Sequence, residues 1–289
     1  MSDLAQRLRD LGLRATADQL DDLVARATKE RWSPVQLLEH VVELEEKDHV
    51  KRSLDRRFTA SHIGRFKPMT NFDWSWPTKI DRERVERALD VGFIAEARNI
   101  VLVAPQGLAK TMIAQNLAHQ AILKGHSVLF LTAAQLLLDL GSQESSRALD
   151  RRLKHYAKVS LLVLDEVGYL AFDNRNADLL FQVVSRRYEK KSLVLTTNLA
   201  FKDWASIFPN ATCATALIDR VIHHADVISV EGERSLPGGS ASSSRALTPI
   251  APRVERGRAS MHAEEWDAVG GFVIRISWAA ISLMQRRGP

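Results

Sequence analysis

Cysteine is almost absent from this chain of 289 residues, which contains only Cys213. A single cysteine excludes an intrachain disulfide framework and any metal site built from several cysteines. Long apolar runs are also missing, because the longest, residues 270–284, is interrupted by Arg275 and is shorter than the about 20 residues that cross a membrane. Residues 1–10 are charged and contain no apolar signal-peptide core. These absences predict a cytoplasmic protein without a membrane partner.

The net charge of +5 is unevenly distributed. Residues 234–289 hold eight arginines and four acids, which leaves 32 basic and 31 acidic residues in the rest of the chain. Only local basic patches can therefore support an argument for nucleic-acid binding by the main body. The content of 45% hydrophobic and 26% charged residues excludes a disordered or fibrous protein.

Residues 1–57 have apolar residues at helical spacing and two capping-box patterns, Thr16 with Gln19 and Ser33 with Gln36. They predict a small all-helical module, followed by a basic and aromatic linker over residues 58–95. A basic patch, residues 51–67, is either a solvated helix end or a surface that contacts phosphates. Three alternate aromatic residues within residues 71–77 favour an apolar collar on the next domain over a base-stacking platform.

Five short β-rich runs alternate with helical stretches from residue 99 onward. They are Asn99–Val103, Ser127–Leu131, Ser160–Leu164, Ser192–Thr196 and Asp226–Val230. This alternation predicts an α/β domain over residues 96–234, with a parallel five-stranded sheet covered on both faces. Residues 235–252 are rich in Ser, Gly, Pro and Ala, so we predict an irregular tail over residues 235–289.

The strongest candidate site follows the first strand. Residues 104–111, APQGLAKT, resemble the phosphate-binding loop G-x-x-x-x-G-K-[ST], in which backbone N–H groups and a helix N-terminus hold phosphates. Lys110 would contact the β- and γ-phosphates of ATP, and Thr111 would hold Mg²⁺. The residues expected to contact the nucleotide are Pro105, Gln106, Gly107, Leu108, Ala109, Lys110, Thr111 and Met112.

Alanine replaces both glycines of that pattern, at Ala104 and Ala109. The replacement at Ala109 is the more serious one, because the backbone there must approach the phosphates closely. If the φ angle of Ala109 is positive, alanine costs about 1 kcal/mol relative to glycine. By itself the loop leaves a nucleotide site and an ordinary strand-to-helix turn as equal alternatives.

A second strand favours the nucleotide site. Residues 161–166, LLVLDE, form an apolar run that ends in two acids. Asp165 would bind Mg²⁺, directly or through water, and Glu166 would orient and polarise the attacking water. The alternative is a strand followed by a polar turn, but such a strand 55 residues after the lysine of a phosphate loop is a rarer combination.

Two further residues are weaker candidates. Asn198 follows the fourth strand, where it could sense the γ-phosphate, although Asn is also common in turns. Arg220 lies in a helical stretch, residues 214–224, and could be an arginine finger that reaches a neighbouring subunit's γ-phosphate, or a surface ion pair. We interpret His223 and His224 as a helix terminus rather than as metal ligands.

Four stretches together resemble the IstB family, the ATP-binding helper proteins of insertion-sequence transposition. They are FDWSWPTKIDRERV, LVLDEVGYL, FQVVSRRYEKKSLVLTTN and LIDRVIHHADVISVEGE. The resemblance covers about residues 1–234 and implies a helical module followed by an AAA+ P-loop NTPase domain, similar to DnaC-type helicase loaders. It also implies that ATP drives a homo-oligomer to assemble on double-stranded DNA and to stimulate a partner transposase.

The resemblance implies a role for each candidate residue. Lys110 and Thr111 match the phosphate loop, Asp165 and Glu166 match the acids that hold the metal and the water, Asn198 matches the sensor, and Arg220 matches the inter-subunit finger. The chain contains no helix-turn-helix or zinc-finger pattern, so binding to DNA is expected to be largely independent of sequence.

Two alternatives to this function stay open. One is a DnaC-like helicase loader. The other is a catalytically impaired nucleotide- and DNA-binding remnant, which Ala109 favours. The tail differs from the family as well, since the family continues with S-Y-R where this chain has Arg234, Ser235, Leu236 and Pro237. A single inserted base would produce that change, so we predict that the residues after Ser235 are translated out of frame.

Overall fold

The computed structural model describes residues 3–75, 77–169, 171–209 and 211–232. The predicted tail and the predicted change of reading frame lie outside these residues. The described residues belong to one compact unit and contain a six-stranded sheet of order β1-β6-β2-β5-β4-β3. The strands are β1 Lys79–Ile80, β2 Asn99–Val103, β3 Val128–Thr132, β4 Leu161–Val167, β5 Ser192–Thr197 and β6 Ala225–Glu231.

The predicted α/β fold with five parallel strands is confirmed, and each predicted run forms one of the strands β2 to β6. One correction is needed, because the sheet has a sixth strand and is mixed. The two-residue strand β1 pairs antiparallel with β6, with Lys79 opposite Glu231 and Ile80 opposite Val230. Two residues carry no β pattern, so the sequence could not indicate this edge strand.

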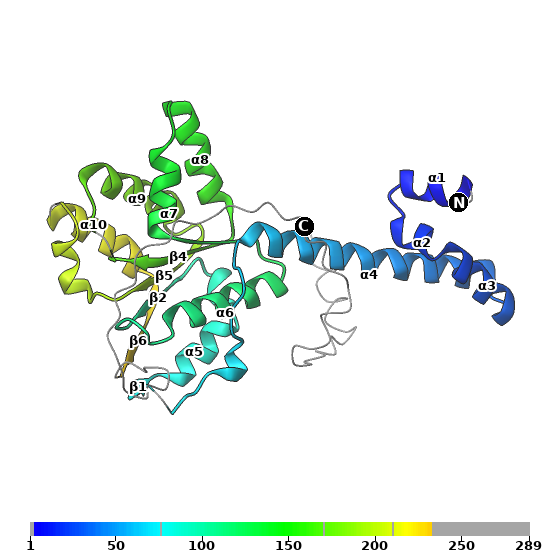
Figure 1. The fold of residues 1–289 in the computed structure, drawn as a ribbon, viewed down its shortest axis with the longest axis horizontal. Helices are drawn as coiled ribbons and strands as arrows, with labels where there is room; N and C mark the ends of the chain where they lie inside the picture. The colour runs from blue at the N-terminus through cyan, green and yellow to red at the C-terminus, as the bar shows by residue number, and fades with distance from the viewer. Residues whose placement is uncertain (1–2, 76, 170, 210, 233–289) are drawn as a thin grey trace, which may run out of the picture. The chain divides into compact units, whose positions relative to one another are not determined.

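Helices cover both faces of the sheet (Figure 1). The helices of the α/β domain are α5 Arg82–Leu89, α6 Lys110–Leu123, α7 Ala133–Gly141, α8 Ser146–Lys158, α9 Asn174–Arg187 and α10 Ala211–Ile222. Helices α5 and α6 pack on one face, whereas α7, α8, α9 and α10 pack on the other. Neighbouring residues of β4 alternate between the two cores, with Leu161 and Val163 in one and Leu162 and Leu164 in the other. Burial on both faces explains why the strands are continuously apolar.

The N-terminal residues form four helices, as predicted. They are α1 Asp3–Asp10, α2 Arg14–Asp18, α3 Leu20–Glu30 and α4 Pro34–Ser61. The capping box at Ser33 and Gln36 is confirmed at the start of α4. The one proposed at Thr16 is wrong, because Thr16 lies inside α2, where its backbone N–H donates to Glu45 Oε1 at 2.8 Å.

Helix α4 crosses residue 57 without interruption and reaches the α/β domain. Arg57 Nε donates to the carbonyl of Ile122 at 3.3 Å, and the ring of Phe58 lies 5.4 Å from the ring of His119 in α6. Short 3₁₀ helices follow at Met69–Asn71, Gly92–Ile94 and Phe201–Ser206.

The aromatic residues after α4 pack against the domain, as the collar interpretation predicted. Phe72 is buried, and its ring meets that of Trp74 edge-on at 4.7 Å. Trp74 packs in turn against the core cluster on the α6 face. The third aromatic residue of this stretch, Trp76, lies outside the described residues. Among the helices that the structure describes, none is long and apolar enough to span a membrane.

Candidate nucleotide-binding site

The loop from β2 to α6 lies at the carboxyl end of the central strand β2. Two buried side chains anchor it, Ala104 and Leu108, while Pro105, Gln106 and Gly107 are exposed between them. Gly107 has a φ of +84°, in the left-handed region that glycine adopts without strain. The middle of the loop is therefore open to solvent, as binding of phosphates by its backbone N–H groups requires.

Ala109 is the N-cap of α6, and its φ is +54°. The φ angle of Ala109 is thus positive, so a residue with a Cβ atom occupies the left-handed region. Such a conformation costs about 1 kcal/mol for alanine. This conformation turns the chain into α6, a helix of 14 residues. The free N–H groups of its first turn point toward the loop.

Lys110 is the first residue of α6 and folds its side chain back over the loop. Its Nζ donates to the carbonyls of Ala104 at 2.6 Å and Pro105 at 2.7 Å. Burial lowers the pKa of the Lys110 ammonium, and the carboxylates of Asp165 and Glu166 oppose that shift. The ammonium is thus held at the loop and close to both acids.

Thr111 and Asp165 come together although 54 residues separate them. Thr111 Oγ1 donates to Asp165 Oδ2 at 2.9 Å, and Asp165 is buried at the carboxyl end of β4. Two adjacent ligands of an octahedral Mg²⁺ with bonds of 2.0–2.1 Å are about 2.9 Å apart. A hydroxyl and a carboxylate at this separation are oxygen donors of the kind that Mg²⁺ takes, so the residues fit this ion.

Thr196 completes the surroundings of Asp165, although no sequence pattern marks it as a site residue. Its hydroxyl donates to Asp165 Oδ1 and accepts a hydrogen bond from the backbone N–H of Glu166 at 2.9 Å. Thr196 is fully buried in β5. Its position two residues before Asn198, at a strand end, was the available signal, but the strand order β5-β4 was needed to interpret it.

Glu166 lies in a β-bulge between β4 and β5, where the register shifts between Leu164 and Val167. Its φ is +59°, and its side chain is exposed while that of Asp165 is buried. A bulge is a common device for re-aiming a side chain beside an active site. Here the bulge separates two consecutive acids into a buried carboxylate and a solvent-facing one.

Glu166 also lines a cavity of about 470 Å³ between α7 and the segment that joins β4 to α9. Most of the lining is apolar, and Thr132, Tyr169 and Asn176 contribute polar groups. A group bound in this cavity would touch Glu166.

Asn198 and Met112 lie near the carboxyl ends of the parallel strands, as the loop does. Asn198 is exposed directly after β5, whose last residue, Thr197, accepts a hydrogen bond from the backbone N–H of Ala104 at 3.1 Å. Met112 is partly buried in the first turn of α6. The structure thus gathers the loop, both acids and Asn198 at the carboxyl ends of β2, β4 and β5.

Arg220 lies near the amino ends of the parallel strands, whereas the loop lies at their carboxyl ends. The next residue, Val221, accepts a hydrogen bond through its carbonyl from Asn99 Nδ2 at 2.9 Å, and Asn99 begins β2. At 3.3 Å per residue, the two ends of β2 are about 13 Å apart. The guanidinium of Arg220 packs 4.4 Å from the ring centre of Phe181 in α9. The structure does not bring Arg220 to the phosphate loop of its own chain.

Comparison with known proteins identifies a family and several relatives. The family described as IstB-like ATP binding protein matches residues 6–236. A protein of Bacillus thuringiensis subsp. berliner, named for the insertion sequence IS232 and for ATP binding, is 33% identical over 230 residues, which cover 80% of this chain and 92% of that protein.

A second relative, from Pseudomonas aeruginosa, is named for the insertion sequence IS21 and for ATP binding. It is 30% identical over 233 residues, which cover 81% of this chain and 88% of that protein. Among solved structures, the crystal structure of DnaI matches with a TM-score of 0.48 and 19% identity, over 60% of this chain and 91% of that one.

Proposed function

Because this chain belongs to the family of IstB-like ATP binding proteins, we propose that it binds ATP with Mg²⁺ in the cytoplasm, assembles as a homo-oligomer on double-stranded DNA and stimulates a partner transposase. The observation that carries the proposal is the contact between Thr111 and Asp165 at 2.9 Å, beside Lys110 at the start of α6. This contact joins the two halves of a triphosphate site from distant parts of the sequence.

Each residue of the site would have a separate task. The N–H groups of the loop and of the first turn of α6 would bind the phosphates, and Lys110 would neutralise their charge. Thr111 and Asp165 would hold Mg²⁺, which supplies charge to the β- and γ-phosphates when bound. Glu166 and Asn198 would orient the attacking water, since both are exposed at this edge of the sheet.

The place of Arg220 supports action between copies of the chain. It lies at the opposite ends of the strands from its own loop, so a role at a phosphate loop would have to be at that of a neighbouring copy. An arginine in this role completes the site of the next subunit. Hydrolysis would then require assembly, which couples ATP turnover to the oligomer.

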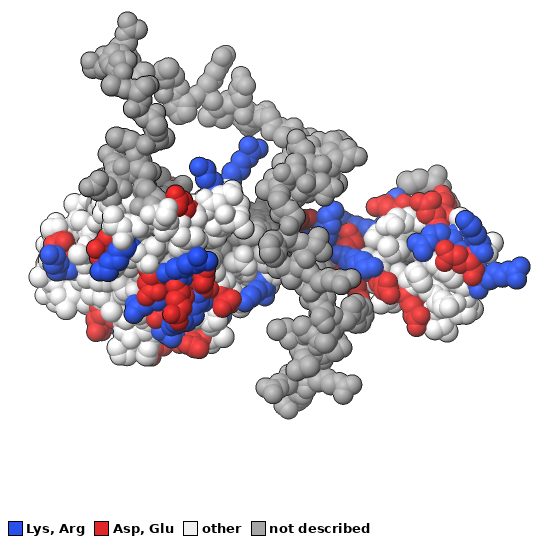
Figure 2. Space-filling view, turned by 90° about the horizontal axis from the view of Figure 1, so that it is seen from below, with Lys and Arg blue, Asp and Glu red and all other residues white. Residues whose placement is uncertain are grey.

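A basic stripe on α8 supports contact with DNA. It consists of Arg147, Arg151, Lys154 and Lys158, which recur at helical spacing and are all exposed. Leu153 and Tyr156, on the other face of α8, are buried in the core. On the face that Figure 2 shows, basic and acidic side chains of the described residues are intermixed.

The end of α4 and the segment that follows it carry further positive charge. Lys51, Arg56, Arg65 and Lys67 are exposed, whereas Arg57 is engaged with the carbonyl of Ile122. His62 at the end of α4 is close enough to His155 on α8 to lower its pKa, after the larger effect of burial and that of Arg152. The predicted patch and the α8 stripe would therefore contact the same duplex through its phosphates.

Replacing the four residues of the α8 stripe with alanine is expected to weaken DNA binding and to flatten its salt dependence. Each phosphate contact contributes about 0.9 to the slope of log K against log salt, so losing four lowers the slope by about 3 to 4. The measurement is fluorescence anisotropy of a labelled duplex between about 50 and 200 mM salt, with ATP and Mg²⁺.

Two controls make this experiment specific. Arg82, Arg84 and Arg87 lie on α5, which packs on the other face of the sheet from α8, so their replacement by alanine should leave the slope unchanged. Lys110→Ala should lose ATP binding, so with ATP present it should bind DNA only as tightly as the wild type does without ATP. If the DNA affinity of the wild type changes with neither salt nor ATP, the proposed function is contradicted.

The transposase is proposed from the relatives alone, since both are named for insertion sequences. A transposase open reading frame next to this gene would provide the candidate partner. Strand transfer by that transposase should increase when the protein and ATP are added, and a lack of any increase would contradict this part of the proposal.

Ala109→Gly is expected to strengthen ATP binding. The methyl group of Ala109 stands at φ +54° where the backbone approaches the phosphates, and its removal relieves about 1 kcal/mol. If that gain appears in binding, the dissociation constant of ATP falls about fivefold. Titration of a fluorescent ATP analogue measures it.

The second replaced glycine of the pattern offers a matched control. Ala104 is not among the residues with positive φ, so Ala104→Gly should give no gain in ATP affinity. Equal affinity and turnover in the wild type and Ala109→Gly would refute the argument. If glycine at 109 is needed before any turnover appears, the natural chain is the impaired remnant considered above.

A further inference from the structure

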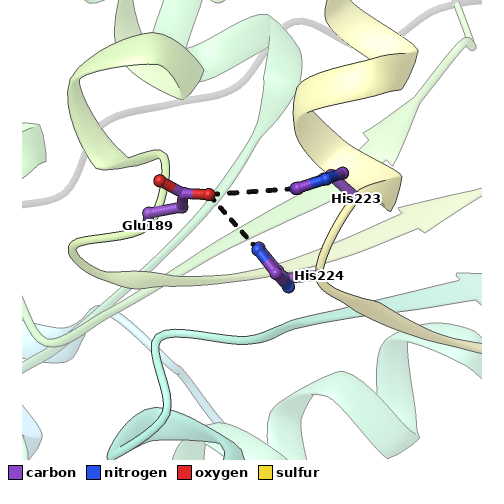
Figure 3. A group of neighbouring side chains, drawn as sticks. All are labelled: Glu189, His223 and His224. Carbon is purple, nitrogen blue, oxygen red and sulfur yellow. Dashed lines mark hydrogen bonds and ion pairs between the residues drawn. The ribbon is translucent and has the colours of Figure 1, made fainter.

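Glu189 meets the adjacent histidines His223 and His224, which lie more than 30 residues further along the chain, where α9 and α10 end (Figure 3). Glu189 follows α9, and His223 and His224 follow α10. Glu189 Oε1 lies 3.2 Å from His224 Nε2 and 3.9 Å from His223 Nδ1. All three residues are exposed, and their ligand atoms lie within 4.8 Å of one another.

The backbone that carries Glu189 is firmly anchored. Two residues earlier, Arg187 is 2% exposed and donates to four carbonyls, those of Tyr156, Val159, Ser160 and Ser192. Lys190 and Lys191 both donate their backbone N–H to the carbonyl of Arg187 at 2.9 Å. These bonds close a tight turn in which Glu189 has a φ of +56°.

The backbone of the histidines is anchored as well. The carbonyl of His224 accepts a hydrogen bond from the N–H of Asn99 at 2.7 Å, at the first residue of the central strand β2. The N–H of His223 donates to the carbonyl of Asp219 at 3.0 Å, in the last turn of α10. Both halves of the cluster therefore stand on rigid elements, as a preorganised site requires.

The donor set matches a transition metal. Two imidazoles and one carboxylate are a common ligand set for Zn²⁺, with bonds of about 2.0–2.2 Å, so ligands at tetrahedral angles are about 3.3 to 3.6 Å apart. The two separations from Glu189, 3.2 and 3.9 Å, lie within about 0.3 Å of this range, and the ligand nitrogens of the two histidines lie within 4.8 Å of each other. Nitrogen ligands suit Zn²⁺ and Co²⁺ better than Mg²⁺, which prefers oxygen.

We propose that Glu189, His223 and His224 form a binding site for a Zn²⁺-class transition-metal ion, with water at the open fourth position. This proposal replaces the interpretation of the two histidines as a helix terminus alone, which did not include Glu189 because it lies 35 residues from His224.

Neighbouring groups determine how strong the site can be. The hydroxyl of Tyr188 is hydrogen-bonded to His223 Nδ1 at 2.9 Å, so it must give up this nitrogen or move into the outer shell when a metal binds. Lys190, Lys191 and Arg220 bring positive charge that opposes a cation, whereas Asp219 favours one. The imidazole nitrogens therefore favour an ion that binds nitrogen strongly, such as Zn²⁺ or Co²⁺, over one that depends on charge alone.

A bound ion would tie the end of α10 to the end of α9. Arg220 precedes His223 by three residues, so the ion would also restrict the helix turn that carries the proposed finger. This consequence rests on the proposed function, but metal binding itself does not.

The test is a titration of the full-length, untagged, nucleotide-free protein with Co²⁺, followed by visible absorption. We expect one equivalent to bind with the ligand-field bands of a four-coordinate ion, Zn²⁺ to displace it, and millimolar Mg²⁺ to leave it in place. Lys110→Ala should bind Co²⁺ as well as the wild type does, which separates this site from the ATP site.

Variants identify the ligands. His224→Ala and the milder Glu189→Gln should each weaken Co²⁺ binding about tenfold or more, while the control His49→Ala, an exposed histidine on α4, should not. Circular dichroism of each variant checks that the fold is retained. Absence of bound Co²⁺, an equal loss in His49→Ala, or a thiolate charge-transfer band from Cys213 would overturn the proposal.

Discussion

Glu166→Gln is expected to stop ATP hydrolysis while leaving ATP bound. Glutamine keeps the size and the bulge conformation of Glu166 but cannot polarise the attacking water. Because Glu166 is exposed and Asp165 is buried, only Glu166 is free to contact that water. Loss of a general base lowers the rate by about 10²–10⁴-fold. Single-turnover hydrolysis measures the rate, and titration of a fluorescent ATP analogue measures the binding.

Asp165→Asn is the matched control, since it changes the neighbouring acid in the same way. Asp165 contacts Thr111 and Thr196, so its neutralisation should weaken Mg²⁺-dependent ATP binding as well as turnover. Only Glu166→Gln should accumulate ATP-bound protein on DNA. If the two variants lose binding and turnover alike, the division of roles between the two acids is wrong.

Arg220→Ala is expected to lower the ATPase rate of the assembled protein by about 10³–10⁵-fold, the range measured for arginine fingers. The reason is its place at the sheet edge opposite the phosphate loop, where it can complete only a neighbour's site. ATP binding by the single chain should be unchanged. Turnover measured against protein concentration, with DNA present, gives the rate of the assembled state.

Mixing two inactive variants tests the action between subunits directly. Lys110→Ala has an intact Arg220, and Arg220→Ala has an intact phosphate loop. A complete site forms where Arg220 of a Lys110→Ala subunit reaches the phosphate loop of a neighbouring Arg220→Ala subunit. A mixture of the two variants should therefore recover part of the wild-type activity. No recovery in mixtures that co-assemble would show that Arg220 acts within its own chain or only in its packing against Phe181.

The sequence predicted those parts of the site that lie within one strand and the turn after it. The loop over residues 104–111 and the acids Asp165 and Glu166 were found because a buried apolar strand followed by polar residues is a local pattern. The five core strands were located for the same reason. The short strand β1 was missed because two residues contain no period to detect.

The sequence could not decide whether Ala109 is strained. Whether alanine is strained depends on the sign of φ, and this angle is set by how the loop turns from β2 into α6. The structure decides it at +54°. The opposite orientations of Asp165 and Glu166 likewise depend on a bulge that exists only because β4 pairs with β5.

What the sequence determined by itself is the place of the five core strands, of most helices and of the loop over residues 104–111, because local periodicity and turn chemistry encode them. The tertiary structure alone decided which distant residues meet: Thr196 with Asp165, Glu189 with His223 and His224, and Arg220 with the far edge of the sheet. The physical reason is that such contacts follow from strand order and helix packing, which depend on burying many apolar side chains at once and leave no signature in any short stretch of residues.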